Sequence, residues 1–202
     1  MKILIYFITL FIFSTFAFAC DNKNSDINFN KENNMNNDNI PNNPKYAYFS
    51  SGCFWGVEYW FEKAEGVFSA ISGYAGGHKA NPTYIEVCTG LTGHLETVKV
   101  GYDADKTTYE DLIKLFFETH NFTQKNGQGP DIGSQYLSAI FYQNEEEKEI
   151  AEKYINILKE KGFDVATTLR EFKNFYEAED YHQDYYSKKG STPYCHFYNK
   201  IF

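Results

Sequence analysis

The sequence predicts a mixed fold, α/β or α+β, in which a sheet carries helices on one or both faces. Strand-like runs alternate with helical runs from about residue 45 onward in the 202-residue chain, a pattern typical of these two classes. Aromatic residues make up 19% of the chain, enough to fill a core and to build an aromatic site. We therefore expect one folded domain of about 150 residues with extensions.

Residues 1–19 are typical of a secretory signal. Lys2 gives a positive start, and an apolar run then ends in Ala17-Phe18-Ala19-Cys20. The run is slightly short for a membrane span. Two processing routes stay open, both cleaving before Cys20: conventional Ala-x-Ala cleavage, or a bacterial lipoprotein signal that lipidates Cys20 first. The residues before Cys20 resemble a lipobox only loosely.

Residues 20–44 predict a tether, since asparagine dominates them and no apolar periodicity is present. A membrane-anchored domain needs such a tether, which would typically hold it roughly 25–30 Å from its anchor. This favours lipidation of Cys20. We expect an exported bacterial protein, anchored in a membrane through Cys20 and facing the periplasm or the cell exterior.

The folded domain is expected to span residues 45–202. It begins with a strand at 46–49 and a helix that follows Cys53 and ends at Gly66. The later elements are, in order, a strand at 67–74, a loop leading into a strand-like stretch at 85–88, a strand at 92–103, a helix at 109–120, a loop rich in Gly, Asn and Gln, a strand at 136–142, a helix at 145–161, a strand at 163–169 and a helix at 178–188. The run 92–103 shows the clearest alternation of a strand.

Cys53 lies at the predicted turn from the first strand to the first helix. Unpaired backbone N–H groups and the helix dipole favour a thiolate there, and Gly52 and Gly56 would let a substrate approach closely. Phe54 and Trp55 follow the thiol directly, as if to hold a small apolar group beside a sulfur nucleophile. A lone cysteine is, however, more often a small buried hydrophobe.

Other candidate residues have ordinary explanations when each is taken alone. Glu96 and His94 could be an exposed pair on a strand. Tyr84 and Tyr136 could be core aromatics with solvated hydroxyls. Asp131 could be a turn residue. The histidines form no i,i+4 pair and the cysteines no C-x-x-C, so we expect no metal site. The net charge of −8 and the lack of a Lys/Arg cluster argue against nucleic acid as a partner.

Eight separated stretches share one further property, namely that they match the motifs of a single family in that family's order. They are Gly52-Cys53-Phe54-Trp55-Gly56, 73–77, 81–84, 87–90, 92–96, 128–136, 181–183 and 194–195. In these stretches the chain resembles the peptide methionine sulfoxide reductases of type A, over residues 45 to about 197. Leu137 and Gly127 stand where that family commonly has arginine, and Asn121-Phe122 replaces Asp-Pro. These departures put in question how the loop before Asp131 is held.

The resemblance implies a ferredoxin-like two-layer sandwich with added helices and loops. It also implies reduction of the S-epimer of methionine sulfoxide, free or in proteins. In the roles that it implies, Cys53 would attack the sulfoxide sulfur, and Phe54 and Trp55 would hold the S-methyl group. Asp131 would orient the amino or backbone nitrogen side of the substrate.

The same resemblance implies that Glu96, Tyr84 and Tyr136 hydrogen-bond the sulfoxide oxygen, with Glu96 giving it a proton. A carboxylate beside Cys53 would raise the pKa of the thiol, so we expect Glu96 to be neutral within aromatic walls. Bringing the pKa of a free thiol to ambient pH takes about 2 kcal/mol. An exposed helix terminus supplies about 0.3–1 kcal/mol, so hydrogen bonds or substrate binding must supply the rest.

Cys195 would condense with the sulfenic acid on Cys53 to a disulfide, which a thioredoxin-like dithiol would reduce. The resemblance implies no metal or organic cofactor, and we expect a monomer. We expect Cys88 to be buried and inert. Two rival functions stay open. One is an anchored binding module stapled by Cys53–Cys88 or Cys88–Cys195. The other is a different thiol enzyme, such as a peroxidase, which leaves Glu96 and the two tyrosines unexplained.

Overall fold

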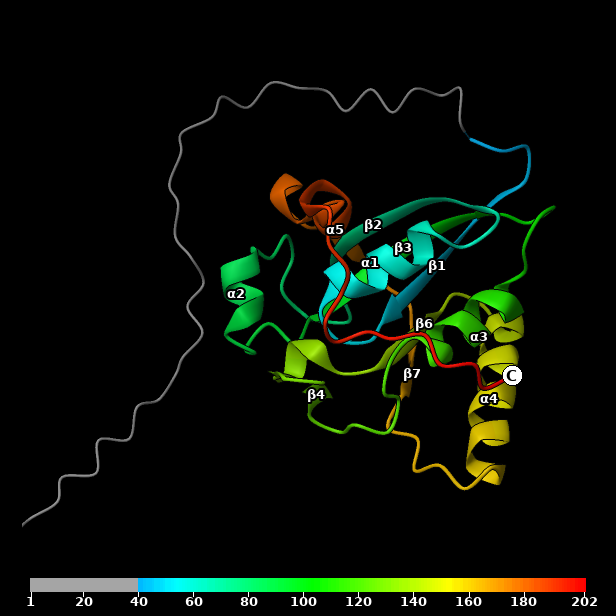
Figure 1. Ribbon diagram of the computed structural model, residues 1–202. Helices are drawn as coiled ribbons and strands as arrows, with labels where there is room; N and C mark the ends of the chain where they lie inside the picture. The colour runs from blue at the N-terminus through cyan, green and yellow to red at the C-terminus, as the bar shows by residue number, and fades with distance from the viewer. Residues whose placement is uncertain (1–39) are drawn as a thin grey trace, which may run out of the picture. The chain divides into compact units, whose positions relative to one another are not determined.

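The computed structural model describes residues 40–202 (Figure 1). The predicted signal, Cys20 and the tether up to residue 39 lie outside these residues, so export, lipidation and anchoring stay predictions. Residues 40–202 all belong to one compact unit of the chain. Among them, no helix combines the length and the apolarity that crossing a membrane requires.

A six-stranded sheet with the order β7-β6-β1-β3-β2-β8 lies at the centre of the fold. Its strands are β1 (Pro44–Ser50), β2 (Val67–Ala75), β3 (Leu95–Asp103), β6 (Ala139–Tyr142), β7 (Thr168–Glu171) and β8 (Phe175–Glu177). β1 lies between β3 and β6 and is antiparallel to both, with Phe49 opposite Val98 on one side and Ile140 on the other. β6 and β7 are parallel. The predicted mixed class is confirmed, whereas the ferredoxin-like sandwich stays a prediction.

Three helices share one core with the sheet: α1 (Phe54–Glu62), α3 (Tyr109–Glu118) and α4 (Glu145–Glu160) (Figure 1). β1 contributes side chains to both faces of the sheet, because successive side chains of a strand point in opposite directions. Ala47 and Phe49 join the core with the helices, and Tyr48 joins a second cluster. The segment between β7 and β8 closes this second face, where Phe172 stacks on Tyr48 at 3.9 Å between ring centroids.

Two predicted elements in the first half differ from the structure. Residues 85–88, predicted as strand-like, belong to the short helix α2 (Tyr84–Cys88), because Thr83 and Glu86 make a capping box at its start. The strand predicted from Thr92 begins only at Leu95, since Gly93 has a φ of +73° that breaks the extended backbone.

The second half of the domain differs more from the predicted elements. Tyr136 ends a 3₁₀ turn, η2 (Ser134–Tyr136), and does not lie on β6. The strand predicted at 163–169 begins at Thr168, because the preceding segment bonds to a loop, with the Ala166 N–H donating to the Phe122 carbonyl at 2.8 Å. The helix predicted at 178–188 is a 3₁₀ turn, η3 (Asp180–His182), and the short α5 (Tyr185–Lys189), separated by Asp184 with a φ of +52°. The edge strand β8 and the hairpin of β4 (Gly127–Gln128) and β5 (Asp131–Ile132) were not predicted.

Candidate active site

Cys53 is the N-cap residue of α1, three residues after the end of β1. The N–H of Trp55 bonds to its sulfur and lowers the pKa of the thiol, as expected for a helix terminus. Burial has the larger effect and raises the pKa of Cys53 well above its usual value, and the charge of Glu96 adds to this rise. The helix terminus alone therefore does not make Cys53 a thiolate in the resting protein.

Glu96 lies on β3 with an exposed fraction of 1%, so it is not part of an exposed pair. Its Oε2 accepts the N–H of Phe54 at 3.0 Å, which links the carboxyl to the residue after Cys53. Burial raises the pKa of Glu96 to about 8, and Asp131 adds to the rise. The carboxyl is therefore mostly protonated at neutral pH, in agreement with the neutral acid that the sequence led us to expect.

His94 has a structural role beside this acid. Its Nδ1 accepts the N–H of Gly77 at 3.2 Å, and its Nε2 lies 2.7 Å from the carbonyl oxygen of Lys79. The ring thus holds the loop that follows β2 against the start of β3.

Aromatic rings pack around Phe54 and Trp55, the two residues that follow Cys53. Phe54 is buried and stacks with Tyr84 at 6.4 Å between centroids. Trp55 is half-buried and fixed twice, since its Nε1 donates to His182 Nδ1 at 3.1 Å and Tyr185 stacks on its face at 3.7 Å. The motif at 181–183 was noted in the sequence without a role for His182, and Tyr185 carried no signal that could have identified it.

Tyr84 and Tyr136 reach the site from α2 and from η2. Burial, and next the charge of Glu96, raises the pKa of both hydroxyls, so both are neutral donors at physiological pH. Cys53 also contributes to the raised pKa of Tyr136, so the thiol lies near the Tyr136 hydroxyl. Cys88, expected to be buried, is half-buried and is hydrogen-bonded to the Tyr84 hydroxyl.

Asp131 lies on β5 and faces the end of the chain. Its Oδ1 accepts the Tyr194 hydroxyl at 3.2 Å, and it also hydrogen-bonds the Cys195 thiol. Burial raises the pKa of Cys195 to about 12, and Asp131 adds to the rise. Cys53, Cys88 and Cys195 are all free thiols. Neither of the disulfides that would staple the rival binding module is therefore present among the described residues.

The loop before Asp131 is held without the arginines that are common in the family. Gly127 has a φ of +151°, and a Cβ there would overlap the carbonyl oxygen of Asp131 across the β4–β5 hairpin. Gln128 donates its Nε2 to the Cys195 carbonyl at 2.9 Å and accepts the N–H of Asn121 at 3.2 Å. The loop and the segment that carries Cys195 are thus joined by one side chain.

The two remaining differences from the family's motifs, at Phe122 and Leu137, lie in the two hydrophobic clusters of the fold. Phe122 is buried in the core shared with the helices, and Leu137 packs against the cluster on the second face. Neither changes a residue of the candidate site.

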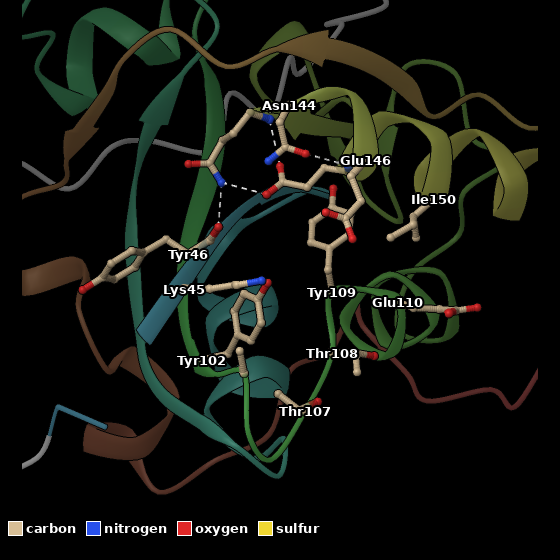
Figure 2. A pocket seen from close by; sticks show the side chains of 13 residues that line it. Lys45, Tyr46, Tyr102, Thr107, Thr108, Tyr109, Glu110, Asn144, Glu146 and Ile150 are labelled. Atoms are coloured by element: carbon tan, nitrogen blue, oxygen red, sulfur yellow. Dashed lines mark hydrogen bonds between the residues drawn. The ribbon is translucent and has the colours of Figure 1, made fainter. Parts of the chain in front are cut away.

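A pocket of about 510 Å³ lies at the opposite end of β1 and β3 from Cys53 (Figure 2). It is bordered by Lys45 at the start of β1, by Tyr102 at the end of β3, and by the first turns of α3 and α4. One of its polar side chains caps a helix: Asn144 Oδ1 accepts the N–H of Glu147 at 2.9 Å at the start of α4. No cysteine or histidine lines this pocket, which is therefore separate from the candidate site.

The described residues contain no group of three or more His, Cys, Asp or Glu side chains that could hold a metal ion. The chemistry available at this site is that of a thiol beside a neutral carboxyl and two hydroxyls, bordered by aromatic rings.

Residues 45–201 match the family model described as peptide methionine sulfoxide reductase. A curated relative from Acinetobacter baumannii, the peptide methionine sulfoxide reductase MsrA, is 50% identical over 151 residues, which are 75% of this chain and 87% of the relative. The MsrA of Natronomonas pharaonis is 49% identical over 152 residues, or 74% of this chain and 85% of the relative.

The fold is similar to that of a solved structure, Mxr1 from Saccharomyces cerevisiae in reduced form. The TM-score is 0.72 and the sequence identity 33%, and the match covers 79% of this chain and 94% of Mxr1. The residues matched by the family model include every residue of the candidate site, from Cys53 to Cys195. The chain therefore belongs to the peptide methionine sulfoxide reductase family, and the protein is an oxidoreductase that acts on methionine sulfoxide.

Proposed function

We propose that the protein reduces the S-epimer of methionine sulfoxide, free and within proteins, by attack of Cys53 on the sulfoxide sulfur. The observation that carries the proposal is the link between Cys53 and Glu96. The turn that positions the thiol also donates the Phe54 N–H to a carboxyl that is protonated at neutral pH. A nucleophile and a proton donor next to each other are what reduction of a sulfoxide requires.

In this mechanism the S-methyl group lies against Phe54 and Trp55, and the sulfoxide oxygen accepts hydrogen bonds from Glu96, Tyr84 and Tyr136. The pKa of Cys53 rises partly because of the charge of Glu96, and that contribution is absent while Glu96 keeps its proton. The remaining activation comes from the Trp55 N–H and from the bound sulfoxide. The thiol therefore becomes reactive when substrate fills the site.

The reaction balances without an external proton. Cys53 attacks the sulfoxide sulfur, the proton of Glu96 moves to the sulfoxide oxygen, and the oxygen is transferred to the Cys53 sulfur as a sulfenic acid. The thiol proton returns to the carboxylate of Glu96. Two electrons pass from the Cys53 sulfur to the substrate sulfur, and methionine leaves.

We further propose that Cys195 resolves the sulfenic acid. The charge of Cys195 is among the causes that raise the pKa of Cys53, after burial and Glu96, which supports an approach of the two sulfurs. The product is a disulfide and water, and a thioredoxin-like dithiol then reduces the disulfide. The yeast protein Mxr1 has also been solved in complex with Trx2, which supports this class of reductant.

The reaction would take place outside the cytoplasm if residues 1–44 act as a signal and a tether. Lipidation of Cys20 would then hold a monomeric enzyme at a membrane surface. Nothing in the proposed chemistry requires a metal or an organic cofactor.

The test is reduction of each sulfoxide epimer by the purified domain with dithiothreitol as reductant. We expect turnover of the S-epimer of both free and peptide-bound methionine sulfoxide, and none of the R-epimer. Equal turnover of both epimers would contradict the proposed specificity. Consumption of peroxide without sulfoxide reduction would favour the rival thiol enzyme.

A further inference from the structure

A buried histidine follows the proposed resolving cysteine and has no role in the mechanism so far. His196 has an exposed fraction of 1%. Its Nδ1 lies 3.1 Å from the Cys195 sulfur, and its Nε2 lies 2.7 Å from the carbonyl oxygen of Ser51, two residues before Cys53. The imidazole therefore bridges the two segments that carry the cysteines.

The contacts of the ring determine where its proton sits. A carbonyl oxygen only accepts hydrogen bonds, so the Nε2 of His196 must carry the hydrogen that is donated to Ser51. Burial lowers the pKa of His196 to about 4, so the ring is neutral at physiological pH. The lone pair of Nδ1 therefore points to Cys195 and can accept the thiol hydrogen, for which the Asp131 carboxyl is the other acceptor.

The ring is held against α1, the helix that begins after Cys53. A Cβ at Gly56 would overlap Nδ1, so only glycine leaves room for the imidazole there. Trp60 of the same helix donates its Nε1 to the His196 carbonyl at 3.4 Å. Gly56, in the signature around Cys53, thus makes room for His196 and not for a substrate.

We propose that His196 is the general base of the resolving step, an inference that rests on the proposed role of Cys195. His196 Nδ1 takes the thiol proton while the Cys195 sulfur attacks the sulfur of the Cys53 sulfenic acid. The S–S bond forms and the S–O bond breaks, so the Cys195 sulfur is oxidised and the Cys53 sulfur is reduced. The leaving hydroxide takes up one proton from solvent and departs as water, and the imidazolium then returns the thiol proton to solvent, so that no net proton is consumed.

The resolving thiol needs such a base because it does not ionise on its own. With a pKa of about 12, only about one Cys195 thiol in 10⁵ is a thiolate at pH 7. A base in contact with the thiol removes the proton during the attack, so prior ionisation is not required.

Several titratable groups influence this proton. Asp131 of β5 and Glu96 of β3 raise the pKa of Cys195. His120, after α3, interacts electrostatically with His196. Tyr186 and Tyr194 interact with both Cys53 and Cys195. Asp131 is the competing base because it also hydrogen-bonds the Cys195 thiol. The experiment must therefore separate His196 from Asp131.

The decisive variant is His196→Gln, whose amide can still donate to the Ser51 carbonyl but cannot take a proton. The reduced protein is mixed with one equivalent of methionine S-sulfoxide and quenched in acid, and the sulfenic acid and disulfide forms are quantified by mass. We expect methionine to form at the wild-type rate and disulfide formation to slow by about 10²–10⁴-fold at pH 7. In the variant its rate should rise about tenfold per pH unit because attack then depends on the thiolate fraction. The wild-type rate should stay flat between pH 6 and 8.

His120→Gln is the matched control, since His120 is also buried and makes two hydrogen bonds, to the Phe116 carbonyl and to Ser138. It should form the disulfide at the wild-type rate. His196→Asn, which keeps an acceptor near Cys195, should be as slow as His196→Gln, and it decides the matter if the glutamine variant does not fold.

A wild-type rate and a flat pH profile in both His196 variants would overturn the inference. The same holds if Asp131→Asn alone produces the slow, pH-dependent step. If even the wild type forms methionine but no Cys53–Cys195 disulfide, the proposed role of Cys195 fails instead.

Discussion

Replacing Glu96 by glutamine tests the proposed acid and its burial at once. The variant keeps the size of the side chain and an oxygen that can accept the Phe54 N–H, but it has no proton to give. The chemical step should slow by about 10²–10⁴-fold, which corresponds to about 3–5 kcal/mol of activation free energy. Substrate affinity should change much less, because the amide still hydrogen-bonds the sulfoxide oxygen.

The same substitution should stabilise the protein, by an amount that depends on pH. Burial raises the pKa of Glu96 from its usual value of 4.5 to about 8, so the folded protein holds a proton that the unfolded chain releases. The free energy of unfolding is unaffected below pH 4.5. It falls by about 1.4 kcal/mol per pH unit as the pH rises toward 8. A glutamine has no such penalty, so the gain in the variant should be about 3 kcal/mol larger at pH 7.5 than at pH 5.

The assay combines urea unfolding, followed by tryptophan fluorescence at pH 5 and 7.5, with single-turnover formation of methionine. Glu58→Gln is the matched control, because burial also raises the pKa of Glu58 to about 8 on α1, outside the site. It should show a similar pH-dependent gain in stability with unchanged chemistry. In the wild type, the chemical step should slow above pH 8, where Glu96 loses its proton. A pH-independent gain in stability, or chemistry at the wild-type rate in Glu96→Gln, would refute the reasoning.

Three further predictions concern the cysteines. Cys53→Ser should abolish reduction with any electron donor, since a hydroxyl is not ionised at neutral pH; appreciable turnover by the folded variant would contradict the assignment. Cys195→Ser should release one equivalent of methionine and then stall with thioredoxin, whereas a stall in Cys88→Ser instead would move the resolving role to Cys88. Cys20→Ser should convert a protein that partitions into detergent into a water-soluble one of equal activity, because stable anchoring depends on buried acyl methylenes worth about 0.8 kcal/mol each. Mass spectrometry of the native amino-terminal peptide that finds Cys20 unmodified would refute the anchor.

Much of the fold could be predicted because long elements have a clear period in sequence. The strands β1 and β2 and the helices α3 and α4 lie where apolar alternation or helical spacing placed them. The failures share a physical cause. α2, β8, β4 and β5 have at most five residues each, too few for a period. α2 is stabilised by its capping box, and β8 by pairing with the distant strand β2.

The candidate site was predictable where its residues lie in continuous motifs, as for Cys53, Glu96 and Tyr84. The supporting residues were not. His182 and Tyr185 matter because they hold the edge and the face of Trp55, a contact across about 130 residues. Such contacts follow from tertiary packing, which a single sequence does not show.

The central place of β1 in the sheet has a consequence for how this protein folds. The strand pairs with β3, about fifty residues later, and with β6, about ninety residues later. As the chain is synthesised, one edge of β1 stays unpaired until β3 has emerged, and the other edge until β6 has emerged. Pairings of such long separation form slowly, and open strand edges can meanwhile recruit other chains. Fragments that end before β6 should therefore aggregate, and a holding chaperone should raise the yield of the full-length protein.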